Sequence, residues 1–193
     1  MSKLLNVSSS PHVRCGVSTK NLMYDVAIAM LPATIWGVMQ FGIYSLIVVV
    51  ATVLSCVLSE YLFETLMHKP VTISDGSALV TGMILGLNMP PAIPLWMPIL
   101  GGVFAIIVVK QLYGGLGQNW MNPALAARCF MLISFAQAMT KFTDPVTDAV
   151  ASATPLAAIK AGDTYDLAAM FIGKIPGTIG EVSVIALLIG AAY

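Results

Sequence analysis

The fold of this chain is decided by residues 43–63, which read IYSLIVVVATVLSCVLSEYLF. The stretch is rich in Val and Leu, and Glu60 is its one charged residue. A helix of about 20 such residues crosses the roughly 30 Å hydrocarbon core of a bilayer. The stretch therefore predicts a transmembrane helix. Glu60 and Glu64 stand one helical turn apart at its end, and we expect them to form a solvated face.

The composition of the whole chain agrees with a membrane protein. Of 193 residues, 58% are hydrophobic and only 9% are charged, against about 25% charged in a soluble domain. The net charge is zero and no basic cluster is present, which argues against a nucleic-acid partner. Cys15, Cys56 and Cys129 are far apart and show no Cys-x-x-Cys spacing. We therefore expect no metal or iron–sulfur site supplied by this chain alone.

The apolar segments predict an all-α fold, a polytopic membrane helix bundle with broken or half-length helices and one long loop. Residues 1–20 form a polar arm without the apolar core of a signal peptide, and residues 21–139 form the bundle. Residues 140–180 form the long loop, and residues 181–193 begin a further helix.

Within the bundle, the expected segments are of unequal length. A first span covers residues 22–39, with Pro32 inside it to kink the helix, and Gly42 marks the following turn. Residues 76–88 are apolar but too short to cross a bilayer, which is typical of half-helices that line a buried site. A fourth segment covers residues 95–109, closed by Lys110, and a helix capped by Asn122 covers residues 123–139.

A small polar stretch in the long loop, residues 148–156, reads DAVASATPL. Thr154 is a natural N-cap and Pro155 suits the first helical position, so a short helix is expected from Leu156 to about Lys160. The free N–H groups and positive dipole end of such a helix favour a phosphate. By itself the pattern is more often a surface helix cap.

Residues 151–154 resemble a flavin-attachment motif, usually Ser/Thr-Gly-Ala-Thr, of a known membrane family. That family contains the D subunit of Rnf complexes and the B subunit of the sodium-pumping NADH:quinone reductase. The resemblance implies FMN joined through its phosphate to the hydroxyl of Thr154, with Ser152 and Asp148 as neighbouring binding residues. Ala151 stands where Ser or Thr is usual, and Ser152 where Gly is usual.

Two further stretches carry the resemblance. Residues 114–128, with a Gly-rich loop followed by Asn-Pro-Ala and an Arg, resemble the family's Gly-rich loop and helix; residues 75–82 resemble the start of its short helix. The resemblance adds Asn119, Asn122 and Arg128 as flavin-binding residues. Alternatively, the glycines serve turns and helix packing, and Arg128 extends to the membrane interface.

Two acidic residues lie at segment edges, Asp25 and Glu181. An interfacial or helix-start role is expected for both. Glu181 alternatively belongs to an ion pathway, because Gly180-Glu181-Val182-Ser183 resembles the start of the family's next helix.

The resemblance implies a membrane subunit of an Rnf-type complex that carries electrons between ferredoxin and NAD, coupled to Na⁺ or H⁺ movement. Its flavin would supply the redox chemistry, and the subunit would not be catalytic alone. Expected partners are a second flavin subunit, iron–sulfur subunits and membrane lipid. The related quinone-reductase subunit also binds riboflavin, which makes riboflavin a second cofactor to consider. Members of the family are longer, so a second set of helices is expected beyond this stretch.

The distribution of basic residues predicts orientation. If the arm is cytoplasmic, six basic residues fall on that side and three on the other, Lys141, Lys160 and Lys174. The expected location is the cell (inner) membrane, with the flavin-bearing loop extracytoplasmic. Alternatives are the quinone-reductase B subunit, a solute channel or secondary transporter, and a purely structural scaffold.

Overall fold

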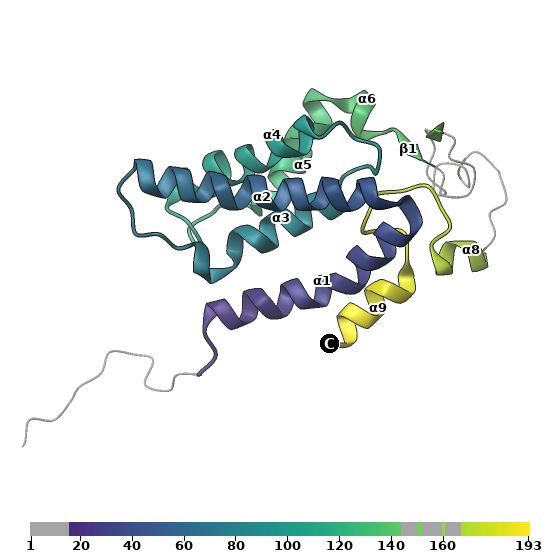
Figure 1. Cartoon of the computed structure of the whole chain (residues 1–193), viewed down its shortest axis with the longest axis horizontal. Helices are drawn as coiled ribbons and strands as arrows, with labels where there is room; N and C mark the ends of the chain where they lie inside the picture. The colour runs from purple at the N-terminus through teal and green to yellow at the C-terminus, as the bar shows by residue number, and fades with distance from the viewer. Residues whose placement is uncertain (1–15, 144–149, 152–159, 161–166) are drawn as a thin grey trace, which may run out of the picture.

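The computed structural model describes residues 16–143, 150–151, 160 and 167–193. Within this part the chain is an all-α membrane helix bundle, as predicted, apart from one ladder of two-residue strands. Three helical stretches are long and apolar enough to cross a membrane: Thr19–Phe41, Ile43–Leu66 and Trp96–Tyr113. Figure 1 shows most of the helices running along the length of the bundle.

The first two long helices are α1, Thr19–Phe41, and α2, Ile43–Leu66. They are joined at Gly42, whose φ of +81° is a conformation that residues with a Cβ rarely adopt, so the predicted turn is confirmed. Pro32 lies inside α1, and the side chain of Ser18 accepts a hydrogen bond from the backbone of Asn21 to cap its start. The prediction of a membrane-spanning helix is therefore confirmed, and the predicted range of residues 22–39 is a few residues short at each end.

The half-length helix α3, Ser77–Leu87, follows the 3₁₀ turn η1, Ile73–Asp75, and packs against α2. Gly82 and Gly86 lie one turn apart on the contact face. A Cβ added at these positions would approach the Cα atoms of Val53 and Val49 to 2.6 and 3.0 Å, respectively. The two backbones therefore meet as closely as small residues allow, which is a common way to pack helices in membranes.

The third long stretch changes its winding along its length. It begins as α4, Trp96–Val103, continues as the π-helix η2, Phe104–Lys110, and ends as the 3₁₀ turn η3, Gln111–Tyr113. The sequence predicts one regular segment over residues 95–109, and periodicity does not reveal this change. π-helical turns inside helices are rare and frequently mark functional positions.

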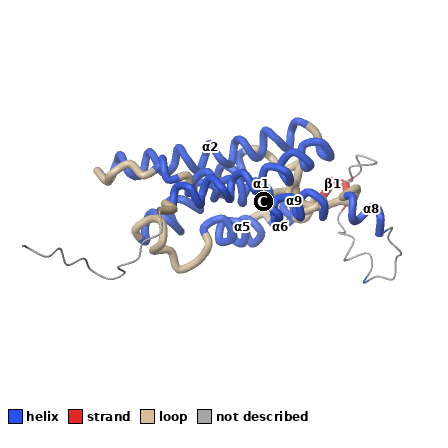
Figure 2. Tube along the Cα trace, turned by 90° about the horizontal axis from the view of Figure 1, so that it is seen from below, coloured by secondary structure: helices blue, strands red, loops and turns tan. Residues whose placement is uncertain are grey.

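The predicted helix over residues 123–139 is divided. α5, Pro123–Ser134, ends at Phe135, and the short helix α6, Ala136–Met139, follows. Phe135 takes φ −133° and ψ 46°, outside the helical region, and its ring packs edge-to-face on Trp96 with centroids 5.2 Å apart. The break in the helix therefore coincides with a tertiary contact. The sequence does not signal it, because the residue at this position is neither Pro nor Gly. Figure 2 shows α5 and α6 on the side of the bundle opposite α2.

The last part of the chain returns to the bundle. Strands β1, Phe142–Thr143, and β2, Val150–Ala151, form an antiparallel pair, and helix α8, Leu167–Ile172, follows. The backbone N–H groups of Ile179 and Gly180 then donate to the carbonyls of Met89 and Leu87, at 3.1 and 2.9 Å. These bonds satisfy carbonyls at the end of α3. The next helix in the chain, α9, Val184–Ala192, packs against α1.

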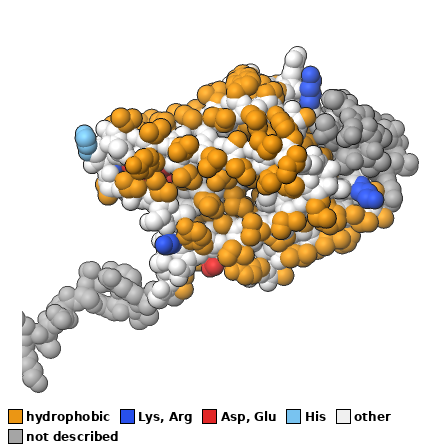
Figure 3. Space-filling view, viewed as in Figure 1, with side chains coloured by type: hydrophobic (Ala, Val, Ile, Leu, Met, Phe, Trp, Pro, Cys, Tyr) orange, Lys and Arg blue, Asp and Glu red, His pale blue; other side chains and the backbone are white. Residues whose placement is uncertain are grey.

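The two ends of the bundle differ in what they carry. β1 and α8 lie at the end where α1 joins α2, and the start of α1 lies at the other end (Figure 1). The face of the bundle seen in Figure 3 is mostly apolar between the ends, with few charged side chains. Side chains such as Leu54 and Leu58 on α2 are more than half exposed. Such a surface fits contact with lipid.

Candidate functional site

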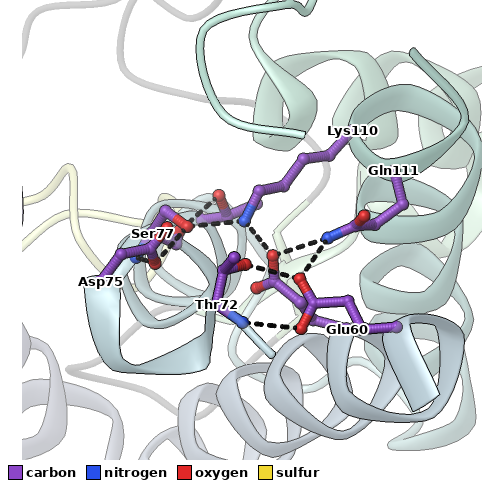
Figure 4. Close-up of polar contacts among 8 residues, drawn as sticks. Glu60, Thr72, Asp75, Ser77, Lys110 and Gln111 are labelled. Atoms are coloured by element: carbon purple, nitrogen blue, oxygen red, sulfur yellow. Dashed lines mark hydrogen bonds and ion pairs between the residues drawn. The ribbon is translucent and has the colours of Figure 1, made fainter. Parts of the chain in front are cut away.

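A network of polar and charged side chains is buried inside the bundle, at the end of α2 (Figure 4). Glu60, Glu64 and Lys110 are 0%, 2% and 1% exposed. The prediction that Glu60 and Glu64 form a solvated face is wrong. The i, i+4 spacing does place both carboxylates on one face of α2, but α3 and η2 cover that face.

Lys110 is the positive centre of the network. Its Nζ lies 2.5 Å from Oε1 of Glu60, which is the one ion pair among the described residues. The same ammonium donates to Oγ of Ser77 at 2.6 Å. The Ser77 hydroxyl in turn donates to Oδ1 of Asp75 at 2.6 Å. One ammonium therefore links, directly or through a hydroxyl, two carboxylates from different elements.

Glu64 is held by donors alone, with no cationic partner within ion-pair distance among the described residues. Thr72 donates from its backbone N–H at 3.0 Å and from its hydroxyl at 2.5 Å. Gln111 donates from Nε2 to Glu60 at 2.8 Å and to Glu64 at 3.2 Å, so one amide joins the two carboxylates. Hydrogen bonds of this kind hold a buried carboxylate in place without neutralising it.

Local sequence explains how each group reaches the network. Asp75 Oδ1 accepts from the backbone N–H of Ser77, the first residue of α3, at 2.8 Å, and Gly76 between them is the N-cap, with φ +77°. Lys110 ends the π-helical turn and Gln111 follows it. Both are buried, and both long side chains donate to Oε1 of Glu60 on α2.

The network contains more buried carboxyl groups than ammonium groups. Two buried carboxylates face one buried ammonium, and Oε2 of Glu60 is buried with no hydrogen-bond partner among the described residues. Ionisable groups inside a membrane bundle are costly and usually mark ion or proton pathways. Sequence reasoning missed this site, although one signal was available: Glu60 interrupts an apolar run and Lys110 ends one.

A second feature is an apolar cavity of about 480 Å³ between η2, the Gly-rich loop and α5. Its lining includes Phe104, Val108, Tyr113, Trp120, Leu125 and Cys129. Such a volume lies within the range of small-molecule and cofactor sites. Phe104 and Val108 belong to the same π-helical turn whose last residue, Lys110, enters the charged network.

The predicted binding residues Asn119 and Asn122 lie in or beside this cavity. Asn122 lines it, but its Oδ1 accepts from the backbone of Ala124 and Leu125, which confirms the predicted N-cap of α5. Asn119 lies next to the lining residue Trp120, and its Oδ1 is buried without a partner in the described part of the chain. The side-chain oxygen of Asn119 is therefore available to accept a hydrogen bond from a ligand, whereas that of Asn122 already accepts from the start of α5.

Arg128, also predicted to bind flavin, has a protein partner. Its Nη1 donates to Oδ1 of Asn88 at 2.6 Å, which ties α5 to the end of α3. The Asn88 amide in turn donates to the carbonyl of Ile84 at 2.8 Å. The arginine is thus partly buried and bonded inside the bundle. Its predicted contact with flavin stays a prediction.

Three predicted residues, Asp148, Ser152 and Thr154, lie outside the described residues, as does most of the helix predicted to begin at Leu156. The described flanks of that region are β1, β2 and α8, and the side chain of Gln40 donates to the carbonyl of Gly173 at 2.8 Å. Of the two acidic edge residues, Asp25 is exposed, and Glu181 accepts from the Thr178 hydroxyl at 2.8 Å.

Comparison with known proteins identifies relatives along nearly the whole chain. It is 47% identical over 195 residues to the D subunit of the Na⁺-translocating ferredoxin:NAD⁺ oxidoreductase complex of Acetobacterium woodii, a match that covers 98% of this chain and 61% of that protein. It is 40% identical over 204 residues to the D subunit of the proton-translocating ferredoxin:NAD⁺ oxidoreductase complex of Clostridium ljungdahlii, covering 98% of this chain and 62% of that protein.

A more distant relative is the D subunit of the ion-translocating oxidoreductase complex of Rhodobacter capsulatus, which is 31% identical over 217 residues; the match covers 94% of this chain and 61% of that protein. The chain thus spans about three fifths of the length of these three relatives. The family model described as NQR2, RnfD, RnfE matches residues 6–193. The chain therefore belongs to the NQR2, RnfD, RnfE family.

Proposed function

We propose that this chain is the D-type membrane subunit of an Rnf-type complex, which carries electrons between ferredoxin and NAD through flavin and couples them to Na⁺ or H⁺ movement. The observation that carries the proposal is the match of 98% of the chain to two D subunits of ferredoxin:NAD⁺ oxidoreductase complexes. The buried carboxylates and ammonium in the bundle support an ion-handling role, because such groups are expensive in a membrane without a function.

The first flavin of the proposal is FMN attached through its phosphate to Thr154. What supports it is the motif at residues 151–154 and the family to which the chain belongs. Ser152 and Asp148 are proposed neighbours of the flavin. With the N-terminal arm on the cytoplasmic side of the cell membrane, the opposite end of the bundle, which bears β1 and α8, is extracytoplasmic. The loop between them would then present the flavin on that side.

A second flavin, riboflavin, fits the apolar cavity beside the Gly-rich loop. The volume of about 480 Å³ is sufficient for a ring system, and the rings of Tyr113 and Trp120 offer apolar faces. The unpartnered Oδ1 of Asn119 would accept an N–H group of the ligand. When bound, the flavin supplies electron transfer; the protein's residues bind it, orient it and exclude water.

The test of the covalent flavin is ultraviolet fluorescence of this subunit on a denaturing gel. Expression includes a flavin transferase and export across the membrane. We expect a fluorescent band from the unaltered protein, no band from Thr154→Val and an unchanged band from Thr140→Val. Thr140 is a matched control, since it lies in the same polar region and its hydroxyl donates only to the carbonyl of Ala136. A dark wild-type band, with the transferase active on another protein, would refute the FMN proposal.

The second candidate function is that of a solute channel or secondary transporter. The observation that favours it is the meeting of the half-length helix α3 with the segment before α9, through the bonds from Ile179 and Gly180. Solute flux through flavin-free vesicles containing the protein would support this function. A flavin spectrum that survives denaturation would exclude transport as the sole activity.

A sodium-pumping quinone reductase remains the alternative within the same family. Quinone-dependent rather than ferredoxin-dependent oxidation by the assembled complex would favour it.

A further inference from the structure

We propose that the segment leading from the third long stretch to α5, residues 112–120, lies in the headgroup region of the bilayer and contacts lipid through its large apolar side chains. We call these residues the interfacial loop. The inference concerns the outer surface of this chain, goes beyond the proposed redox function and does not rest on a bound flavin.

The interfacial loop exposes large apolar side chains and carries no charge. Leu112, Tyr113 and Trp120 are each more than half exposed, and Leu116 is exposed as well. No charged residue occurs between Lys110 and Arg128 in the sequence. Exposed apolar groups that gather in one place mark contact with a membrane or with another protein, whereas a loop in water is usually polar.

The start of the loop stands at the edge of the hydrocarbon layer. The stretch Trp96–Tyr113 has 18 residues, roughly enough to cross a bilayer core of about 30 Å. Trp96 begins this stretch and Tyr113 ends it, and both rings are more than half exposed. Trp and Tyr are enriched at the two membrane–water interfaces, because their rings are apolar and carry one polar group. Tyr113 therefore marks the level of one interface.

The loop then returns close to this level. The ring centroids of Tyr113 and Trp120 lie 6.2 Å apart, although seven positions separate the two residues in the chain. Gly114, Gly115 and Gly117 take positive φ angles, which lets the chain reverse within these few residues. In Figure 2 the loop that leads into α5 extends from the end of the bundle. Both aromatic rings are therefore placed to meet the same layer of lipid headgroups.

A lysine lies beside the interfacial loop. Lys69 is exposed, and its Nζ donates to the carbonyl of Gln111, the residue before Leu112, at 3.5 Å. An ammonium has three N–H donors, so this long bond leaves donors for the phosphate of a lipid headgroup. Basic side chains at a membrane surface are attracted to anionic lipid. Aromatic rings next to an exposed cation are what contact with headgroups requires.

The surface on the other side of the loop continues the apolar surface of the helices. Val108 on η2 and Leu125 on α5 are exposed, and both line the apolar cavity together with Tyr113 and Trp120. The apolar surface therefore passes from the helices into the loop without a charged residue. This continuity favours lipid over a water-soluble partner, because the lipid that covers the helices reaches the loop as well.

The test is photo-cross-linking of the assembled complex in its native membranes. The variants are Leu116→p-benzoylphenylalanine and Trp120→p-benzoylphenylalanine, whose excited ketone forms a bond to a neighbouring C–H carbon. Mass spectrometry of this subunit then identifies the attached molecule. We expect phospholipid adducts at both positions, at yields at least about tenfold above that of the same substitution at Lys174, an exposed charged residue after α8. The same substitution at Leu58, exposed on the apolar helix α2, is the lipid-facing reference.

Fluorescence quenching checks the same contact without a photoreactive residue. The emission of Trp120 is obtained as the difference between the unaltered complex and Trp120→Phe, both reconstituted in phospholipid vesicles. We expect brominated phospholipid to reduce this emission at least about threefold more than iodide in the buffer does, because the ring lies among lipid.

Two outcomes would overturn the inference. A cross-link from Leu116 or Trp120 to another protein chain would identify a neighbouring subunit as the occupant of this surface. An absence of lipid adducts at both positions, with adducts present at Leu58, or stronger quenching by iodide than by brominated lipid, would place the loop in water.

Discussion

The charged network and the apolar cavity lie against the same π-helical turn and are built in opposite ways. The network is closed, and its charges are tied by short hydrogen bonds to three elements. The cavity is lined by aromatic and aliphatic side chains with few polar atoms. The comparison teaches that the network depends on mutual compensation of its charges, whereas the cavity depends on empty space. Substitutions should therefore affect stability in the first and ligand binding in the second.

The largest effect on stability is expected from Lys110→Met. It removes the ammonium and leaves Glu60 buried without compensation, at a cost of about 3–5 kcal/mol. The double variant Glu60→Gln/Lys110→Met removes both charges and should recover all but about 1 kcal/mol of this loss. Denaturant unfolding of the detergent-solubilised protein measures both. Equal losses in the single and double variants would contradict mutual compensation.

A smaller loss of stability is expected from Gly82→Leu. A Cβ at Gly82 would already approach Val53 Cα to 2.6 Å, so a leucine would force α3 from α2, at about 1–3 kcal/mol or more. Gly16→Ala is the control, since a Cβ there meets no atom within 4 Å. The same unfolding measurement applies, and an unaltered Gly82→Leu protein would rule out close packing at this point.

The cavity is tested by filling it. Ala126→Phe on α5 projects a ring into the lining and should reduce bound riboflavin about tenfold, equivalent to about 1.4 kcal/mol of binding free energy. The measurement is fluorescence of flavin released on denaturation, normalised to protein. Ile133→Phe, at a position 84% exposed on the same helix, should leave the riboflavin content unchanged. Unchanged riboflavin in Ala126→Phe would place the flavin elsewhere.

The smallest effect is expected from Asn122→Ala. Its Oδ1 caps α5 through the N–H groups of Ala124 and Leu125, and loss of an N-cap costs about 1 kcal/mol. Riboflavin binding should change little, because that oxygen is already used. Asn119→Ala should do the reverse, reducing riboflavin with little effect on stability. Parallel unfolding and flavin measurements on the two variants check this contrast, and identical behaviour would refute the division of roles.

Several features of the fold were predictable because they depend on local chemistry. The apolar run of α2 predicts a membrane helix whatever surrounds it, and Gly42 marks the turn that its positive φ requires. Asn122 followed by Pro123 predicts the start of α5. The short length of residues 76–88 predicts a half-helix, which is α3. Each of these follows from residues adjacent in the chain.

The charged network was not predictable in the same way. The spacing of Glu60 and Glu64 indicates a shared face of α2 but not what covers that face. The covering groups come from Lys110 and Gln111, about 50 positions away in the chain. Lys110 ends a π-helical turn and Gln111 begins a 3₁₀ turn, and this change of winding has no clear sequence signal. The break at Phe135 is similar, since its ring packs on Trp96 from another helix.

The sequence by itself thus determined a membrane helix bundle, its helix starts and turns, and the family resemblance around Thr154. Only the tertiary structure decided that Glu60 and Glu64 are buried, that Lys110 pairs with one of them, and that Arg128 bonds to Asn88. The physical reason is the range of the forces involved. Hydrophobic length and capping act within a few residues, whereas the state of a buried charge depends on which partner the packed helices bring to it.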